Sequence, residues 1–204
     1  MNVFRIFTFI LFFTAGGHLL AEAAPVEKLK STVEGALDVL YLGDYQDLSE
    51  SARQAKVRDI IESNYDLSVL IRRAMGRNWG LLNASEQEQV LDLVKRLILK
   101  AYFEGLEGRA RPQVSFGATV DVASNRIEIP STVVSDGEEY RVLYRLGRME
   151  SGWQIYDIVA EGISIVSNYR QQFDDHFRRG TAAGLISKLK DLLAQPELNE
   201  DFKL

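Results

Sequence analysis

Few residues in this chain of 204 have the types and spacing that catalysis requires. The segment Gly162-Ile163-Ser164-Ile165-Val166 is similar to the Gly-x-Ser-x-Gly turn that presents a nucleophilic serine, but valine replaces the second glycine. A serine nucleophile also needs a histidine base, and the two histidines are His18, near the N-terminus, and His176, on the same predicted helix as Ser164. We therefore interpret Ser164 as the N-cap of that helix.

Two carboxylates, Asp157 and Glu161, could form a pair for acid–base chemistry. Arg145 and Arg170 are available as ionic partners. We favour a structural role, in which Asp157, Glu161 and Arg170 form a network that holds the last strand against the helix after it.

Basic residues on two predicted helices could bind a phosphate group, but we favour a solvated helix face as their explanation. They are Arg72, Arg73, Arg77, Lys95, Arg96 and Lys100. The chain has no cysteine, which excludes thiol nucleophiles, disulfides and thiolate metal sites. With so few histidines, no multi-histidine zinc site can be built, and we predict neither a metal nor a cofactor. The net charge of −5 argues against a nucleic-acid partner.

The hydrophobic pattern predicts helices first, then strands, then helices again. Helical spacing is found over about 25–43, 49–64, 66–76 and 85–104, with Ser85 and Glu88 as a capping box. Alternation then predicts strands around 114–116, 127–133, 140–146 and 153–159, with Val120 and Val122 as a possible extension of the first. Helical spacing returns over about 163–173 and 185–196, with Ile163 as the first residue of the apolar face.

This order of elements predicts the α+β class: a strongly twisted antiparallel sheet wrapped by helices, with a helical annex. We expect a helical half over about 25–110, a sheet over about 112–160 and C-terminal helices over about 163–195. The helix over 85–104 has an unusually wide apolar face, so it must be covered on more than one side, by protein or by an apolar ligand.

The N-terminus has the pattern of a cleavable signal peptide. Arg5 precedes an apolar run over residues 6–15, and Ala21-Glu22-Ala23 fits a small-x-small cleavage site. The run is too short for a membrane anchor, which is the alternative, because a spanning helix needs about 20 apolar residues. We predict cleavage after Ala23 and an exported single domain over residues 24–204.

Two blocks of sequence carry a family resemblance. Asp66-Leu67, followed by Arg72-Arg73-Ala74-Met75-Gly76-Arg77-Asn78-Trp79, is the first. The second runs from Trp153-Gln154-Ile155-Tyr156-Asp157-Ile158 through Glu161-Gly162-Ile163-Ser164 to Asn168-Tyr169-Arg170-Gln171-Gln172-Phe173. These blocks resemble, in order, those of the MlaC-type periplasmic phospholipid-binding proteins, also called toluene-tolerance auxiliary proteins of an ABC transporter. Leu67 replaces an aromatic residue of that pattern and Met75 replaces a leucine.

The resemblance implies a carrier that shuttles one glycerophospholipid across the periplasm in a pathway that maintains outer-membrane lipid asymmetry. It implies a sheet of the NTF2-like kind, with the acyl chains in an internal apolar cavity between sheet and helices. The implied partners are an outer-membrane lipoprotein–porin complex and an inner-membrane ABC transporter with a lipid-binding ring. An enzyme on an NTF2-like sheet, and an adaptor of an ABC transporter that binds no lipid, are the alternatives.

The energetics of lipid transfer agree with the apolar surplus of the sequence. Two acyl chains contain roughly 30 methylene groups, and burying each is worth about 0.8 kcal/mol, so only a deep, dry cavity competes with a bilayer. The residues expected to line that cavity are Met75, Leu93, Leu97, Ile98, Ala101, Tyr102, Val142, Tyr144, Leu146, Ile158, Ile163, Val166 and Tyr169. Ordinary core packing is the alternative for each of them.

Overall fold

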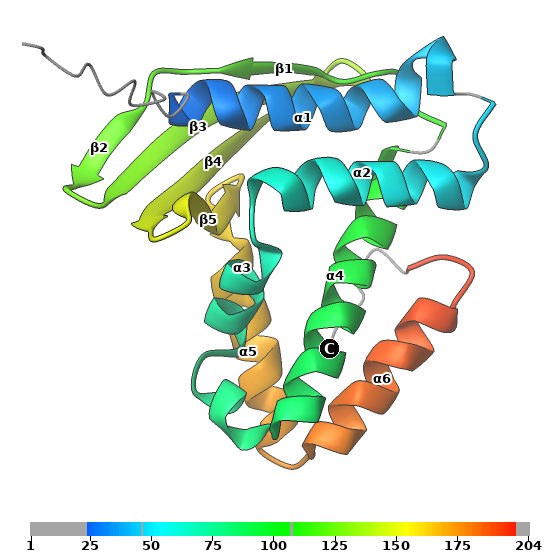
Figure 1. Cartoon of the computed structure of the whole chain (residues 1–204), viewed down its shortest axis with the longest axis vertical. Helices are drawn as coiled ribbons and strands as arrows, with labels where there is room; N and C mark the ends of the chain where they lie inside the picture. The colour runs from blue at the N-terminus through cyan, green and yellow to red at the C-terminus, as the bar shows by residue number, and fades with distance from the viewer. Residues whose placement is uncertain (1–23, 46, 107, 199–204) are drawn as a thin grey trace, which may run out of the picture.

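The computed structural model describes residues 24–45, 47–106 and 108–198 (Figure 1). The predicted signal peptide and its cleavage site therefore lie outside the described residues. In the described part, a group of helices is followed by an antiparallel sheet and by two further helices. This arrangement confirms the predicted α+β class.

The N-terminal helices begin and end at recognisable signals. They are α1 (Pro25–Tyr41), α2 (Glu50–Asn64), α3 (Leu67–Met75) and α4 (Ala84–Leu106), with short 3-10 helices η1 (Gly43–Tyr45) and η2 (Gly76–Leu81). Ser49 caps α2 by accepting a hydrogen bond from the amide of Ala52, and Asp66 caps α3 through the amide of Ser68. Gly76 ends α3 at a φ of +54°, a conformation that glycine adopts without strain.

The predicted capping box of α4 is wrong by two residues. The Asn83 side chain accepts from the amide of Glu86 at 3.0 Å, and the Glu86 carboxylate accepts from the amide of Asn83 at 2.9 Å. Asn83 and Glu86 thus form the reciprocal pair that was expected of Ser85 and Glu88. The helix starts earlier because Gln87 hydrogen-bonds the carbonyls of Trp79 and Leu82, which fixes its first turn.

Six strands form one antiparallel sheet with the order β1-β3-β4-β5-β6, and β2 also pairs with β3. They are β1 (Gln113–Phe116), β2 (Val120–Ala123), β3 (Arg126–Ser135), β4 (Glu138–Met149), β5 (Gly152–Ala160) and β6 (Ile163–Ser164). Asp136 and Gly137 make the predicted hairpin turn, both with positive φ. Val120 and Val122 do not extend β1 but form β2, because β1 and β2 pair with different parts of the same edge of β3.

The chain continues into α5 (Ile165–Phe177) and α6 (Ala182–Ala194). Ser164 caps α5, as predicted, by accepting from the amide of Ser167. Ile163 does not start the apolar face of this helix: it lies in β6, and 63% of its surface is exposed. His176 contacts the carbonyl of Thr181 at 3.0 Å and thereby ties the end of α5 to the start of α6.

Three apolar clusters hold these layers together. Helix α1 runs along the sheet (Figure 1), and Leu29 packs there with Ile127, Ile129 and Leu146. A second cluster joins α1, α2 and α4, and a third joins α3, α4, α5 and α6 below the sheet. Among the described residues, every helix is too short or too polar to cross a membrane.

Candidate functional site: an apolar cavity among four helices

A small apolar cavity of about 70 Å³ lies among α3, α4, α5 and α6. Its walls are almost entirely aliphatic and aromatic. Leu70, Ile71 and Ala74 come from α3, Val94, Leu97, Ile98 and Ala101 from α4, Ile165, Tyr169 and Phe173 from α5, and Leu189 from α6. Each helix turns its apolar face inward, so the cavity needs all four.

Four of the predicted residues, Leu97, Ile98, Ala101 and Tyr169, line this cavity. The predicted set lacks Val94, Ile165, Phe173 and the whole contribution of α3. Leu70, Ile71 and Ala74 repeat at helical spacing, so the apolar face of α3 was a usable signal. Leu189 was also missed, because its place opposite α4 depends on how α6 packs.

The other predicted residues lie in three different surroundings. Met75, Leu93 and Val166 are buried in the same four-helix cluster, and Ile158 packs against it. Leu146 is fully buried between the sheet and α1, where Tyr144 packs beside it, whereas Tyr102 packs in the cluster of α1, α2 and α4. Val142 lines a separate hollow, and Ile163 is exposed.

The hollow around Val142 is an open depression of about 680 Å³ at the end of the sheet. Phe116, Pro130, Ser131, Leu143 and Val159 contribute to its walls, together with the polar residues Arg141 and Glu161. It is wider and more polar than the cavity among the helices.

Three tyrosines lie close together in the interior. Burial raises the pKa of Tyr144 to about 12, and it also raises the pKa values of Tyr65 and Tyr102, to which Tyr144 adds a smaller effect. These residues come from β4, the end of α2 and α4, so the inner face of the sheet meets the helices at this point. The Tyr65 hydroxyl is buried without a hydrogen-bond partner among the described residues.

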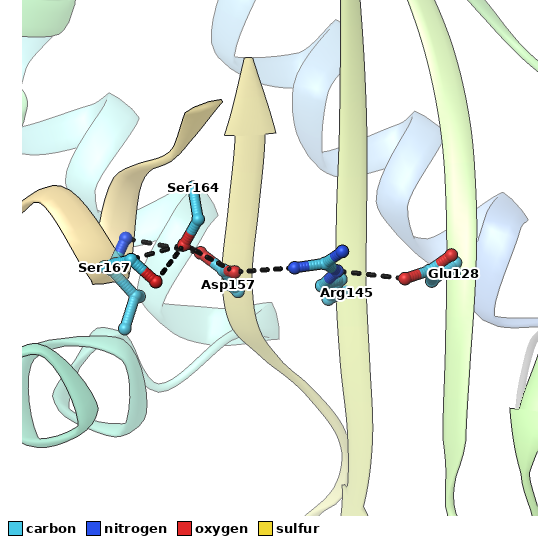
Figure 2. Close-up of polar contacts among 6 residues, drawn as sticks. Glu128, Arg145, Asp157, Ser164 and Ser167 are labelled. Carbon is cyan, nitrogen blue, oxygen red and sulfur yellow. Dashed lines mark hydrogen bonds and ion pairs between the residues drawn. The ribbon is translucent and has the colours of Figure 1, made fainter. Parts of the chain in front are cut away.

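A polar row crosses the sheet and ends at the start of α5 (Figure 2). Arg145 donates to Glu128 at 2.9 Å and to Asp157 at 3.2 Å. Asp157, which is buried, also accepts from the Ser164 hydroxyl at 2.8 Å and from the amide of Val166. The hydrogen bond to Glu128, followed by that to Asp157, raises the pKa of Arg145 against the opposing effect of burial.

The prediction that Asp157, Glu161 and Arg170 form one network is wrong, because each of them contacts different partners. Asp157 does hold β5 against α5, but Glu161 accepts from the backbone amide of Arg141, and Arg170 donates to the backbone carbonyl of Arg73. Arg170 therefore ties α5 to α3. The long side chain of Arg170 reaches a backbone carbonyl on α3, which is remote from α5 in the sequence.

Most of the basic residues considered for phosphate binding form ion pairs. Arg77 contacts Asp174, Lys95 contacts Glu62, Arg96 contacts Asp92 and Lys100 contacts Glu104. Lys100 also donates to the carbonyl of Gln195, and Glu104 accepts from the amide of Leu198, so this pair anchors the end of α6 to α4. Within the described ranges, no cluster of three His, Asp or Glu side chains could hold a metal ion.

Comparison with known proteins assigns the fold. A solved structure of the phospholipid-binding protein from Ralstonia solanacearum, in complex with a phospholipid, matches this chain with 25% sequence identity and a TM-score of 0.73. The match covers 83% of this chain and 98% of that one. A domain of unknown function with a cystatin-like fold from Nostoc punctiforme matches with 19% identity over 53% of this chain and 67% of that one, and its TM-score of 0.27 is too low to indicate a shared fold.

No curated protein matches the chain. Residues 30–191, however, match the profile of the family described as MlaC protein, in agreement with the resemblance found in the sequence. The chain therefore belongs to the MlaC family.

Proposed function

We propose that this protein is a carrier that binds a glycerophospholipid by its acyl chains and shuttles it between two membranes. The observation that carries the proposal is the apolar cavity among α3, α4, α5 and α6, in a chain whose Ralstonia relative in fold holds a phospholipid. In this proposal residues 24–204 act as one lipid-binding domain, as the sequence predicts.

The cavity must widen to hold an acyl chain. Pockets that enclose small ligands have volumes of about 300–1,000 Å³, whereas this cavity measures about 70 Å³. Burial of roughly 30 methylene groups away from water is worth on the order of 20 kcal/mol, and the widened cavity must provide burial of this extent to compete with a bilayer. Leu189 of α6 covers the cavity, so widening requires α6 to shift against α4. Lys100 and Glu104 hold the C-terminal end of α6, and His176 contacts Thr181 at its start.

Extraction of the purified protein tests the proposal. Protein expressed with export in a bacterial host should release phospholipid into organic solvent, in a molar ratio to protein that mass spectrometry determines. A preparation that is fully folded and free of lipid contradicts the carrier function.

Two positions on α4 offer a matched pair of variants. Leu97 lines the cavity and is 4% exposed, whereas Leu99 is 3% exposed and packs in the cluster of α1, α2 and α4. Leu97→Asn and Leu99→Asn should destabilise the fold by similar amounts, but only Leu97→Asn should lower the lipid bound per folded molecule. Equal lipid content in the two variants contradicts the assignment of the cavity.

The location and partners follow from the family and remain part of the proposal. We place the protein in the periplasm, after cleavage of a signal peptide behind Ala23, which N-terminal sequencing of the exported protein checks. Its partners in this scheme are an outer-membrane lipoprotein–porin complex and an inner-membrane ABC transporter with a lipid-binding ring.

We propose a carrier in preference to an enzyme because the candidate catalytic residues have structural contacts. Ser164 and Asp157 bond each other and the first turn of α5. His176 lies near the other end of α5, about 18 Å further along the helix axis at 1.5 Å per residue. Ser164→Ala should therefore leave lipid transfer intact, and loss of a measurable esterase activity in that variant contradicts this role.

A further inference from the structure

The hydroxyl of Tyr65 is buried without a hydrogen-bond partner among the described residues. Tyr65 lies between α2 and the N-cap of α3, and only 2% of its surface is exposed. It packs in the cluster that joins α1 to the sheet, together with Leu29, Ile127, Ile129 and Leu146. A buried O–H group that donates to nothing costs free energy, and native proteins rarely retain one. This hydroxyl therefore requires an acceptor that the apolar side chains around it do not supply.

Two further tyrosines lie in the same part of the interior. Tyr144 of β4 packs against the cluster of Tyr65 and is half-buried. Tyr102, near the end of α4, packs against the cluster of α1, α2 and α4. Tyr144 contributes to the raised pKa of both other tyrosines, so it lies near each of them. The hydroxyls of Tyr102 and Tyr144 also make no hydrogen bond within the described part of the chain, so three O–H donors lie together where the sheet meets the helices.

The tyrosines are next to the end of the apolar cavity that faces the sheet. Helix α4 rises towards α2 and the sheet (Figure 1), and Ala101 is the last of its residues to line the cavity, directly before Tyr102. Tyr65 immediately precedes Asp66, the N-cap of α3, whose apolar face forms another wall. Ile155 of β5 packs against both the four-helix cluster and the cluster of Tyr65. The two regions are therefore contiguous.

An ester carbonyl is the acceptor that suits this position. A neutral O–H donor in apolar surroundings can satisfy a neutral carbonyl oxygen, whereas a phosphate would have to lose its hydration to reach a residue as buried as Tyr65. In a diacyl glycerophospholipid, an ester carbonyl joins each acyl chain to the glycerol. When the chains occupy the cavity among the helices, the carbonyls lie at the end of the hydrocarbon. Entry of the chains from the side of the sheet brings these carbonyls to the tyrosines.

We propose that the hydroxyl of Tyr65, with those of Tyr144 and Tyr102 beside it, hydrogen-bonds an ester carbonyl of the bound phospholipid. We call this contact the ester anchor. The inference rests on the proposed function, to which it adds a specificity: the carrier selects the linkage of the chains to glycerol. A lipid with ether-linked chains has no carbonyl at this point, so it leaves the Tyr65 hydroxyl unpaired, and a site built to hydrogen-bond a group rejects the analogue that lacks it.

Competitive loading tests the ester anchor. The exported protein is delipidated and incubated with vesicles that contain equal amounts of diester and diether phosphatidylcholine with chains of the same length. Mass spectrometry then determines the ratio of the two lipids extracted from the re-isolated protein. The wild type should take up about fivefold more diester than diether lipid, which is the factor that one net hydrogen bond contributes to affinity. Tyr65→Phe should take up the two lipids equally.

Tyr140→Phe is the matched control. Tyr140 lies on the same face of β4 as Tyr144, but it is 42% exposed, so its hydroxyl has water as a partner. This variant should keep the preference of the wild type. Tyr65→Phe should fold, because it removes no hydrogen bond between described residues. If it does not fold, Tyr144→Phe, at a half-buried position, should still lower the preference for the diester.

The outcomes separate the ester anchor from the carrier function. Equal uptake of the two lipids by the wild type refutes the anchor alone. A folded Tyr65→Phe that keeps the full preference, or an equal loss of preference in Tyr140→Phe, also overturns it. Folded wild type that takes up neither lipid refutes the carrier function itself.

Discussion

Filling the cavity from α4 should stabilise the protein and reduce its lipid content at the same time. Ala101 lines the cavity, and Ala101→Leu adds three carbon atoms there. Empty core volume costs about 24 cal/mol per Å³, so a void of about 70 Å³ corresponds to about 1.7 kcal/mol. We expect delipidated Ala101→Leu to gain about 1–1.7 kcal/mol in the free energy of unfolding, which raises Tm by about 2–7 °C in a protein of this size.

The assay is urea unfolding of the delipidated proteins, with extracted phospholipid determined in parallel on untreated protein. Ala36→Leu is the control, because Ala36 is buried in the cluster of α1, α2 and α4 and overpacking there should cost about 1–3 kcal/mol. If Ala101→Leu destabilises as much as Ala36→Leu, the void is not available to a side chain. If it stabilises but leaves the lipid content unchanged, the acyl chains do not enter there.

Three further predictions concern stability. Tyr65→Phe removes a buried hydroxyl without a partner, so it should leave the free energy of unfolding unchanged or raise it by about 1 kcal/mol; a loss above that amount in urea unfolding would falsify the assignment. Asp157→Asn should cost about 3 kcal/mol, because Arg145 and the start of α5 lose a buried charged acceptor, and thermal unfolding that matches the wild type contradicts this. The hydrogen bond from Asn78 lowers the pKa of Asp174 below its ordinary value of 3.8 against the opposing effect of desolvation, and the charge of Arg77 adds a smaller lowering. The contribution of ionised Asp174 to stability is therefore complete above pH 3.8 and is lost as the pH falls through the lowered pKa. Wild type and Asp174→Asn should differ in the free energy of unfolding at pH 7 and converge in strong acid. A difference that stays constant across the pH range contradicts the pairing.

In the helical part of the candidate site, helical periodicity indicates which side chains share a face. Leu97, Ile98 and Ala101 follow from the wide apolar face of α4. Periodicity does not say which layer covers that face. Leu97 and Leu99 are almost equally buried, yet only Leu97 faces the cavity, and the packing of α1 and α2 on the opposite side decides this.

The strands show the same limit more strongly. Val142, Tyr144 and Leu146 alternate on one side of β4 as predicted. Their surroundings differ along the strand, because α1 and its Leu29 cover Leu146 whereas Val142 lies beyond, in the open hollow. How far α1 extends over the sheet depends on tertiary packing. The alternation of β4 therefore predicts which side chains share a face of the sheet, but not what packs against each of them.

Long polar side chains are the least predictable part. Arg170 was expected beside the carboxylates of its own region but reaches the carbonyl of Arg73. Two overlapping Asn/Ser-x-x-Glu patterns lie at the start of α4, and the first is the one that forms the capping box, next to the contact of Gln87 with Trp79 of η2. In both cases the choice depends on a partner remote from the local pattern.

The order of the cavity-lining residues along the chain determines when the site can form during synthesis. Its lining residues begin with Leu70 on α3 and end with Leu189 on α6, so they enter the chain early and late. A chain that emerges N-terminus first therefore presents the apolar faces of α3 and α4 before α5 and α6 exist to cover them. Until α6 has been synthesised, these apolar faces form a surface that a chaperone can bind. They enclose the cavity only after α5 and α6 have packed against them.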